Sequence, residues 1–271
     1  MILSEQVTVK PRFARSANIE RDLSPAAIEG YLPTGRALDV VARIGRGLLA
    51  PSAGRALAIT GPHGAGKSSL AVFLNTLFAP RDSETYQTAR EVLRSANPAV
   101  AAVFDQGLEA IDSRGRGAVR AFATASHEPV TVTVARALHA GAQCALGERQ
   151  TVVPAVFGED EASRNLSVRE VRDVVGALCA VQPVVLVIDE FGKNLEAFAA
   201  SGREGDPFLL QSLAETAQGE SALPLVIITM QHLAFEEHAG AHLWRYAANG
   251  PRCKAGSRTF RTSRPRGMRG G

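Results

Sequence analysis

The sequence predicts an α/β fold in which helices flank a mainly parallel β-sheet. Three apolar runs, over 56–60, 184–188 and 223–229, predict the strands. Unbroken runs of this kind are typical of strands that are buried on both faces, as in parallel sheets. The segments between them carry apolar residues at helical spacing. The alternation of the two patterns therefore indicates βα units.

The helices are predicted by apolar residues that recur every three or four positions. This spacing favours helices over 36–49, 69–78 and 83–96. A further helix begins at Ser167, where Ser167 and Glu170 form a capping-box pattern, and it ends before Pro183.

A glycine-rich motif directly follows the first predicted strand. It matches the Walker A pattern G-x-x-x-x-G-K-[ST] without a mismatch, through Gly61, Pro62, His63, Gly64, Ala65, Gly66, Lys67 and Ser68. In this pattern backbone N–H groups surround phosphates, Lys67 reaches the β- and γ-phosphates, and the Ser68 hydroxyl ligates Mg²⁺. Ser69 continues the helix N-terminus, which favours an anion. The combination predicts a P-loop NTPase core that binds ATP; the alternative is a tight turn that binds nothing.

Two carboxylates follow the second apolar run. Asp189 and Glu190 stand at the carboxyl end of the predicted strand, where ligands bind in open α/β sheets. In the manner of a Walker B motif, Asp189 would hold Mg²⁺ and Glu190 would activate a water that attacks the γ-phosphate. The alternative is a pair of solvated acids at a strand end.

The third apolar run ends in polar residues that provide weaker candidates. Thr229 or Gln231 is suited to sense the γ-phosphate from the strand beside the acidic one, or equally to cap a strand end. Four further histidines are not spaced as metal ligands usually are: His127, His139, His238 and His242.

Composition describes an ordinary globular chain of 271 residues, with 45% hydrophobic and 21% charged residues. The pI is near 9.0, but residues 245–271 hold eight of the 30 basic side chains and no acid. The rest of the chain contains 22 basic and 27 acidic residues, so it is mildly acidic. Three widely spaced cysteines indicate no disulfide framework. With no membrane-length apolar run and no signal-peptide pattern, we expect a cytoplasmic protein without a membrane partner.

Together these motifs resemble bacterial AAA-type ATPases. The closest likeness is to large STAND-like proteins of phage-defence gene clusters, including the ATPases of bacteriophage-exclusion (BREX) systems. Besides the P-loop, the resemblance rests on the segments 188–196, 230–237, 15–22 and 30–34, and it covers roughly residues 10–238. It implies that Tyr31 and Thr34, ahead of the P-loop, lie near the adenine. It also implies partners: other subunits of a multi-protein bacterial system, DNA, or further copies of the chain.

The expected organisation is a leader over 1–35, an ATPase core over 36–238 and a basic tail over 239–271. Because Ser68 and Asp189 are farther apart than in a minimal AAA core, we expect an inserted helical segment at about 80–165. Within it, residues 129–134 alternate Val and Thr, which predicts a strand.

The tail has two interpretations. One is a disordered basic segment that contacts nucleic acid. The other is that the tail is out of frame, which makes the chain a truncated or frameshifted N-terminal fragment. Within codon degeneracy, a shifted frame over 249–265 can encode RAKVQGRFEDIPYVEA, which resembles the continuation of the family after this strand.

The sequence therefore predicts an ATPase that converts ATP and water to ADP and phosphate. The first alternative is a nucleotide-dependent switch that hydrolyses ATP slowly. The second is an inactive fragment that binds nucleotide and does nothing further.

Overall fold

The computed structural model describes residues 17–22, 24–147, 166–201, 208–218 and 224–232. Within these ranges the protein has an α/β fold with one sheet of four strands, all parallel, in the order β1-β4-β3-β2. The strands are β1 (Ala56–Thr60), β2 (Val119–Thr124), β3 (Val184–Asp189) and β4 (Leu225–Gln231). The predicted α/β class and the three predicted strands are confirmed.

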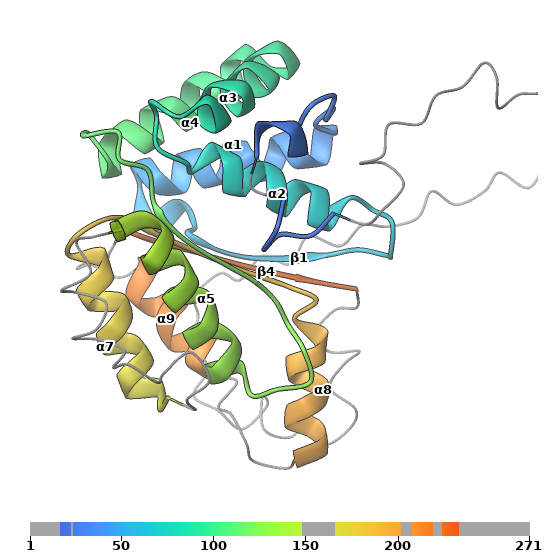
Figure 1. Ribbon diagram of the computed structural model, residues 1–271, viewed down its shortest axis with the longest axis vertical. Helices are drawn as coiled ribbons and strands as arrows, with labels where there is room; N and C mark the ends of the chain where they lie inside the picture. The colour runs from blue at the N-terminus through green and yellow to red at the C-terminus, as the bar shows by residue number, and fades with distance from the viewer. Residues whose placement is uncertain (1–16, 23, 148–165, 202–207, 219–223, 233–271) are drawn as a thin grey trace, which may run out of the picture.

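Helices cover both faces of the sheet (Figure 1). One face is covered by α1 (Gly35–Leu49), α2 (Lys67–Leu77), α3 (Glu84–Ala96) and α4 (Pro98–Ile111). The other is covered by α5 (Val130–Leu146), α7 (Val168–Cys179) and α9 (Phe208–Gln218). Helix α8 (Gly192–Ser201) follows β3, and two 3₁₀ turns, η3 (Pro25–Ala27) and η4 (Pro51–Ala53), flank α1.

Strand β3 lies inside the sheet and is buried along its whole length. Its side chains alternate between the two faces, as the geometry of a strand requires. Val185 and Val187 pack in the cluster that contains α2, while Leu186 and Ile188 pack in the cluster that contains α5 and α7. This burial explains why the run is continuously apolar up to Asp189.

The predicted helix positions agree closely with the structure. The capping box at the start of α7 is present, because the Ser167 hydroxyl accepts the N–H of Glu170 and the Glu170 carboxylate accepts the N–H of Ser167. These bonds satisfy two N–H groups that a helix start otherwise leaves unpaired.

The strand predicted over 129–134 is wrong, because these residues begin α5. Helix α5 packs closely on β2: a Cβ on Gly141 would lie 2.7 Å from the carbonyl oxygen of Arg120. This tertiary packing overrides the β preference of the alternating Val and Thr residues. The segment 80–165 is therefore not a wholly helical insertion, since its described part also supplies β2 to the central sheet.

The described part of the leader packs onto the core. Ile19 and Ile28 are buried in the cluster around α1 and α2. The Glu20 carboxylate accepts the N–H of Thr124 at 2.7 Å, at the end of β2, and lies 3.2 Å from Nη1 of Arg136. The described part of the leader thus contacts the carboxyl end of β2.

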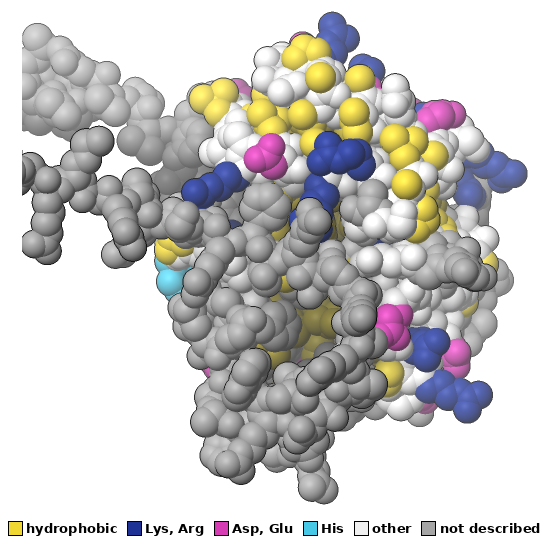
Figure 2. All heavy atoms as spheres, turned by 180° about the vertical axis from the view of Figure 1, so that it is seen from behind, with side chains coloured by type: hydrophobic (Ala, Val, Ile, Leu, Met, Phe, Trp, Pro, Cys, Tyr) yellow, Lys and Arg dark blue, Asp and Glu magenta, His cyan; other side chains and the backbone are white. Residues whose placement is uncertain are grey.

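On the face shown in Figure 2, the described Lys and Arg side chains are interspersed with Asp, Glu and hydrophobic side chains. Among the described residues, no helix is long and apolar enough to cross a membrane. The basic tail over 239–271, with both of its interpretations, lies outside the described residues.

Candidate functional site

The predicted phosphate loop connects β1 to α2. Its residues from Pro62 to Gly66 are exposed, and Gly64 and Gly66 have φ angles of 75° and 84°. These left-handed conformations favour glycine over any residue with a Cβ. Helix α2 begins at Lys67, and Ser68 and Ser69 continue its first turn beside the loop. The loop therefore needs glycine at these two positions of the motif.

Lys67 is folded back onto the loop. Its Nζ donates to the carbonyl oxygens of Gly61 at 2.7 Å and Pro62 at 2.9 Å. Burial lowers the pKa of Lys67, and the carboxylates of Asp189 and Glu190 oppose that shift. The ammonium thus holds a position at the loop from which it can exchange carbonyl partners for phosphate oxygens.

Ser68 and Asp189 meet although they are far apart in the sequence. The Ser68 hydroxyl donates to Oδ2 of Asp189 at 2.6 Å. Both side chains lie on the α2 face of the sheet, at the carboxyl ends of the strands.

The donor set at this point suits Mg²⁺. No group of three or more His, Cys, Asp and Glu side chains that could hold a metal occurs among the described residues. Mg²⁺ commonly takes one or two protein oxygens and completes its shell with water and substrate phosphates. The paired oxygens of Ser68 and Asp189 fit that pattern.

Glu190 adopts an unusual backbone conformation. Its φ of 53° is the only positive value for a non-glycine residue in the described chain. Its N–H donates to Oδ1 of Asp189 at 2.8 Å, and its carboxylate forms an ion pair with Lys193. A non-glycine residue in this region costs on the order of 1 kcal/mol and is concentrated at functional sites. The hydrogen bond between the Glu190 N–H and Asp189 ties the backbone of one acidic residue to the side chain of the other.

A pair of histidines lies over Lys67. The rings of His63 and His232 have centroids 3.2 Å apart, and Nδ1 of His232 lies 3.2 Å from Nζ of Lys67. Burial, followed by the positive charges of Lys67 and His63, lowers the pKa of His232.

His232 is a site residue that the sequence interpretation missed. The available signal was its place directly after β4, the strand that pairs with β1 and so ends beside the loop. Of the other histidines, His127 lies 3.0 Å from a carboxylate oxygen of Glu196 and His139 lies 3.3 Å from Gln143. His238 and His242 lie outside the described residues.

Thr229 and Gln231 are buried in β4, but neither contacts Ser68 or Asp189 through its side chain among the described residues. Their neighbour Met230 packs in the α2 cluster, so strand alternation directs both side chains to the opposite face. Both polar side-chain atoms of Gln231 are buried without a hydrogen-bond partner in the described chain. Buried polar groups in native proteins are usually hydrogen-bonded to protein or to ordered water.

The end of β4 joins the two loops through its backbone. The carbonyl oxygen of Gln231 accepts the N–H of Gly61 at 3.2 Å, and that of Met230 accepts the N–H of Phe191 at 2.9 Å. The phosphate loop and the acidic loop after β3 are therefore both anchored to adjacent residues of one strand.

A cavity of about 150 Å³ adjoins the loop, and Tyr31, Thr34, Asp39, Arg43, Ala65 and Lys67 are among the residues that line it. The Tyr31 ring lies 4.9 Å from that of Phe73, and burial raises the pKa of Tyr31 to about 12. The cavity brings the two adenine candidates, Tyr31 and Thr34, to the same hollow as Lys67.

Comparison of the chain with protein-family models, curated proteins and solved structures gave no match. The assignment of a function therefore depends on the site itself.

Proposed function

We propose that this chain binds ATP with Mg²⁺ at the loop over 61–68 and hydrolyses it to ADP and phosphate, as a P-loop NTPase core of the AAA type. The observation that carries the proposal is the 2.6 Å hydrogen bond from Ser68 to Asp189. A Walker A hydroxyl and a Walker B carboxylate must share one Mg²⁺, and these two side chains already lie within the reach of one ion.

Each residue then has a role. Lys67 exchanges the Gly61 and Pro62 carbonyls for β- and γ-phosphate oxygens. Ser68 and Asp189 hold Mg²⁺, which neutralises phosphate charge when bound. Glu190 accepts a proton from the attacking water. The cavity beside Tyr31 and Thr34 receives the base, where the Tyr31 ring offers a face for stacking.

Gln231 is the preferred candidate for a residue that responds to the γ-phosphate. Its amide is unsatisfied, and its carbonyl oxygen is bonded to Gly61 of the loop. Thr229 lies deeper in β4 and is the weaker candidate. A response through Gln231 would act on the loop through the backbone rather than by direct contact with phosphate.

The resemblance to ATPases of phage-defence clusters extends the proposal to partners. DNA, other subunits of a bacterial multi-protein system and further copies of this chain are the candidates. Turnover measured with and without DNA separates a DNA-dependent motor from a DNA-independent ATPase.

The proposal is tested by ATP binding and turnover in three variants. Lys67→Ala should weaken ATP binding by about 100-fold, because charge-assisted hydrogen bonds each contribute about 1.5–3 kcal/mol. Glu190→Gln should keep ATP binding and lose turnover, so that ATP stays bound. Arg94→Ala, at an exposed position of α3, is the control and should behave as wild type. Unchanged turnover in both site variants would exclude the proposal.

One observation favours a second candidate, a switch that binds ATP and hydrolyses it slowly. The Glu190 carboxylate is paired with Lys193, so the proposed base is engaged before any water is activated. A protein of this kind would signal by its bound nucleotide and would turn over only when a partner breaks the ion pair. Single-turnover hydrolysis distinguishes it from a constitutive ATPase.

A further inference from the structure

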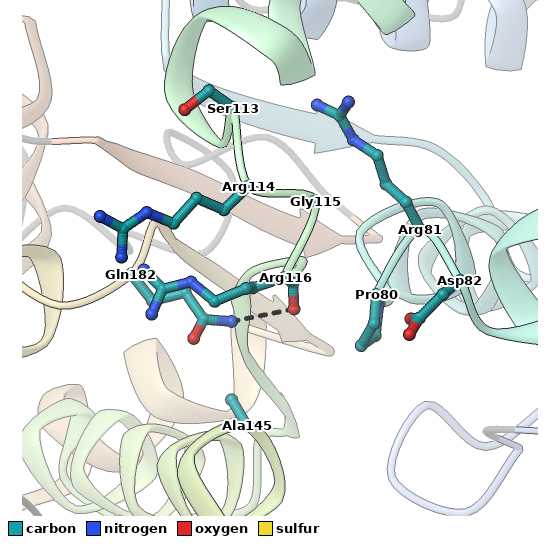
Figure 3. A pocket seen from close by; sticks show the side chains of 9 residues that line it. All are labelled: Pro80, Arg81, Asp82, Ser113, Arg114, Gly115, Arg116, Ala145 and Gln182. Carbon is teal, nitrogen blue, oxygen red and sulfur yellow. Dashed lines mark hydrogen bonds between the residues drawn. The ribbon is translucent and has the colours of Figure 1, made fainter.

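A second hollow lies at the opposite end of the strands from Lys67. It has a volume of about 680 Å³, and its lining includes Arg81, Asp82, Ser113, Arg114, Arg116 and Gln182 (Figure 3). Arg116 comes just before β2 and Gln182 just before β3, so the hollow is at the amino-terminal edge of the sheet. The phosphate loop is at the carboxyl edge. The two sites are therefore separate.

The loop that carries the two central arginines is held rigidly. The Asp112 carboxylate accepts the N–H groups of Arg116 at 3.2 Å and Gly117 at 2.7 Å. The Gln182 amide donates to the carbonyl oxygens of the same two residues at 3.2 and 2.9 Å. Gly117 has a φ of 78°, and a Cβ there would lie 2.7 Å from the backbone of Ala79. The loop is thus fixed before any ligand arrives, as efficient binding requires.

The guanidinium groups of two arginines on this loop lack a full set of hydrogen-bond and ion-pair partners among the described residues. The side chains of Arg114 and Arg116 extend in the same direction, and Arg116 lies against Gln182 (Figure 3). Arg116 donates from Nη2 to the carbonyl oxygen of Val181 at 2.8 Å, while its Nε is buried without a partner in the described chain. Arg114 is exposed and forms no hydrogen bond or ion pair with a described residue.

The nearby carboxylates do not neutralise these two arginines. Glu109 pairs with Arg81, and Asp112 is occupied by backbone N–H groups. Asp82 lies on the opposite wall of the hollow (Figure 3). Two adjacent guanidiniums that form no ion pair with a described carboxylate provide the planar, forked donors that suit phosphate oxygens.

We propose that this hollow binds a phosphate group, which Arg114 and Arg116 contact with their guanidiniums. The phosphate belongs either to a free phosphorylated small molecule or to the backbone of a polynucleotide. The inference does not depend on the proposed ATPase activity, because it uses none of the residues of the loop over 61–68.

The test compares the 271-residue chain with its double variant Arg114→Gln/Arg116→Gln, and both carry Lys67→Ala so that the loop over 61–68 no longer binds phosphate strongly. Arg94→Gln in the same background is the matched control, because it removes an exposed arginine elsewhere and leaves every other charge in place. Arg114→Glu is a second variant. It alters a side chain that makes no described contact, so it leaves the fold of the loop intact.

The first arm measures pyrophosphate binding by calorimetry, and the second measures binding of a fluorescent dT20 oligonucleotide as a function of salt. If the ligand is a small molecule, the double variant and Arg114→Glu lose at least about tenfold in pyrophosphate affinity, while oligonucleotide binding is unchanged. If the ligand is a polynucleotide, oligonucleotide affinity falls by at least about tenfold. In a plot of the logarithm of the oligonucleotide binding constant against the logarithm of the salt concentration, the double variant then has a slope that is smaller in magnitude by about 1.4, because two phosphate contacts are lost. Affinities equal to those of the Arg94→Gln control in both arms would overturn the proposal.

Discussion

Nζ of Lys67 lies 3.2 Å from Nδ1 of His232, so the first residue of α2 contacts the residue that follows β4. Lys67 has two further partners, the carbonyl oxygens of Gly61 and Pro62. A nucleotide that recruits the ammonium must replace all three contacts. These contacts stabilise the ligand-free state and therefore oppose nucleotide binding, and the free energy that they contribute can be measured.

Removal of the histidine should increase the affinity for ATP. In His232→Ala the ammonium loses the Nδ1 partner, and the ligand-free state is destabilised relative to the bound state. A contact at this partly exposed position is worth up to about 1 kcal/mol, so the dissociation constant should fall by roughly threefold to fivefold. Equilibrium binding of a fluorescent ATP analogue measures the change. A weaker affinity in the variant would show instead that His232 contacts the nucleotide.

The stability of the protein should depend on pH through the same residue. The pKa of His232 is lowered in the folded protein from its ordinary value of 6.5. As the pH falls through 6.5, the unfolded chain takes up a proton before the folded one, so the free energy of unfolding falls. The loss stops once the pH is below the folded pKa. Urea unfolding between pH 7.5 and 5 should show a smaller decrease in the free energy of unfolding for His232→Asn than for wild type. Equal decreases would show that His232 is not the source of the pH dependence.

Release of Glu190 from its ion pair should speed hydrolysis. Exposed ion pairs contribute up to about 1 kcal/mol, so Lys193→Ala should raise single-turnover hydrolysis by up to about fivefold if the pair restrains the base. The ion pair lies between side chains that are 41% and 34% exposed. Lys193→Arg keeps the positive charge, so its rate of single-turnover hydrolysis should equal that of wild type. A rate in Lys193→Ala below that of wild type would assign the lysine to catalysis instead.

The loop before β2 should tolerate no side chain at Gly117. Gly117→Ala forces a Cβ against the backbone of Ala79 at a positive φ, and we expect a loss of about 1–3 kcal/mol in the free energy of unfolding. Gly176→Ala in α7 is the matched control, because no atom other than the backbone of its own helix and its chain neighbours lies within 4 Å of its Cβ position. The control should gain about 0.5–1 kcal/mol from helix propensity. Chemical denaturation measures both, and equal effects would disprove the close approach.

Two cysteines should differ in reactivity. Cys144 is exposed, while burial raises the pKa of the buried Cys179 thiol to about 12. Because the thiolate is the reactive form, Cys179 should react with a disulfide reagent only after unfolding, whereas Cys144 should react in the native protein. Mass spectrometry of the labelled peptides distinguishes the sites. Native labelling of Cys179 would indicate that α7 opens from the sheet.

Some elements were predictable because one local signal dominates. The run from Ala56 to Thr60 is apolar, is bounded by a turn and a glycine loop, and forms β1 over the predicted residues. The meeting of Ser68 with Asp189 was also predictable, since parallel strands end at one edge of the sheet.

Other elements depend on contacts that the sequence does not reveal. Strand β2 includes Arg120 and two alanines, so its apolar signal is weak, and pairing with β3 makes it a strand. The alternating residues after Pro129 became helix because α5 packs on β2. His232 joins the site only because β4 lies beside β1, and strand order is not a local property of the sequence.

Strand β3 also sets how strongly the two candidate sites can influence each other. Its six residues separate the edge near Gln182 from the edge at Asp189, and at about 3.3 Å per residue they span about 20 Å. The Debye length at physiological ionic strength is only about 8 Å. Counter-ions therefore screen the solvent-exposed charges at the two ends from each other. Inside the protein the two ends are joined by β3, a strand that is packed on both faces, and its displacement is a route by which one site can act on the other.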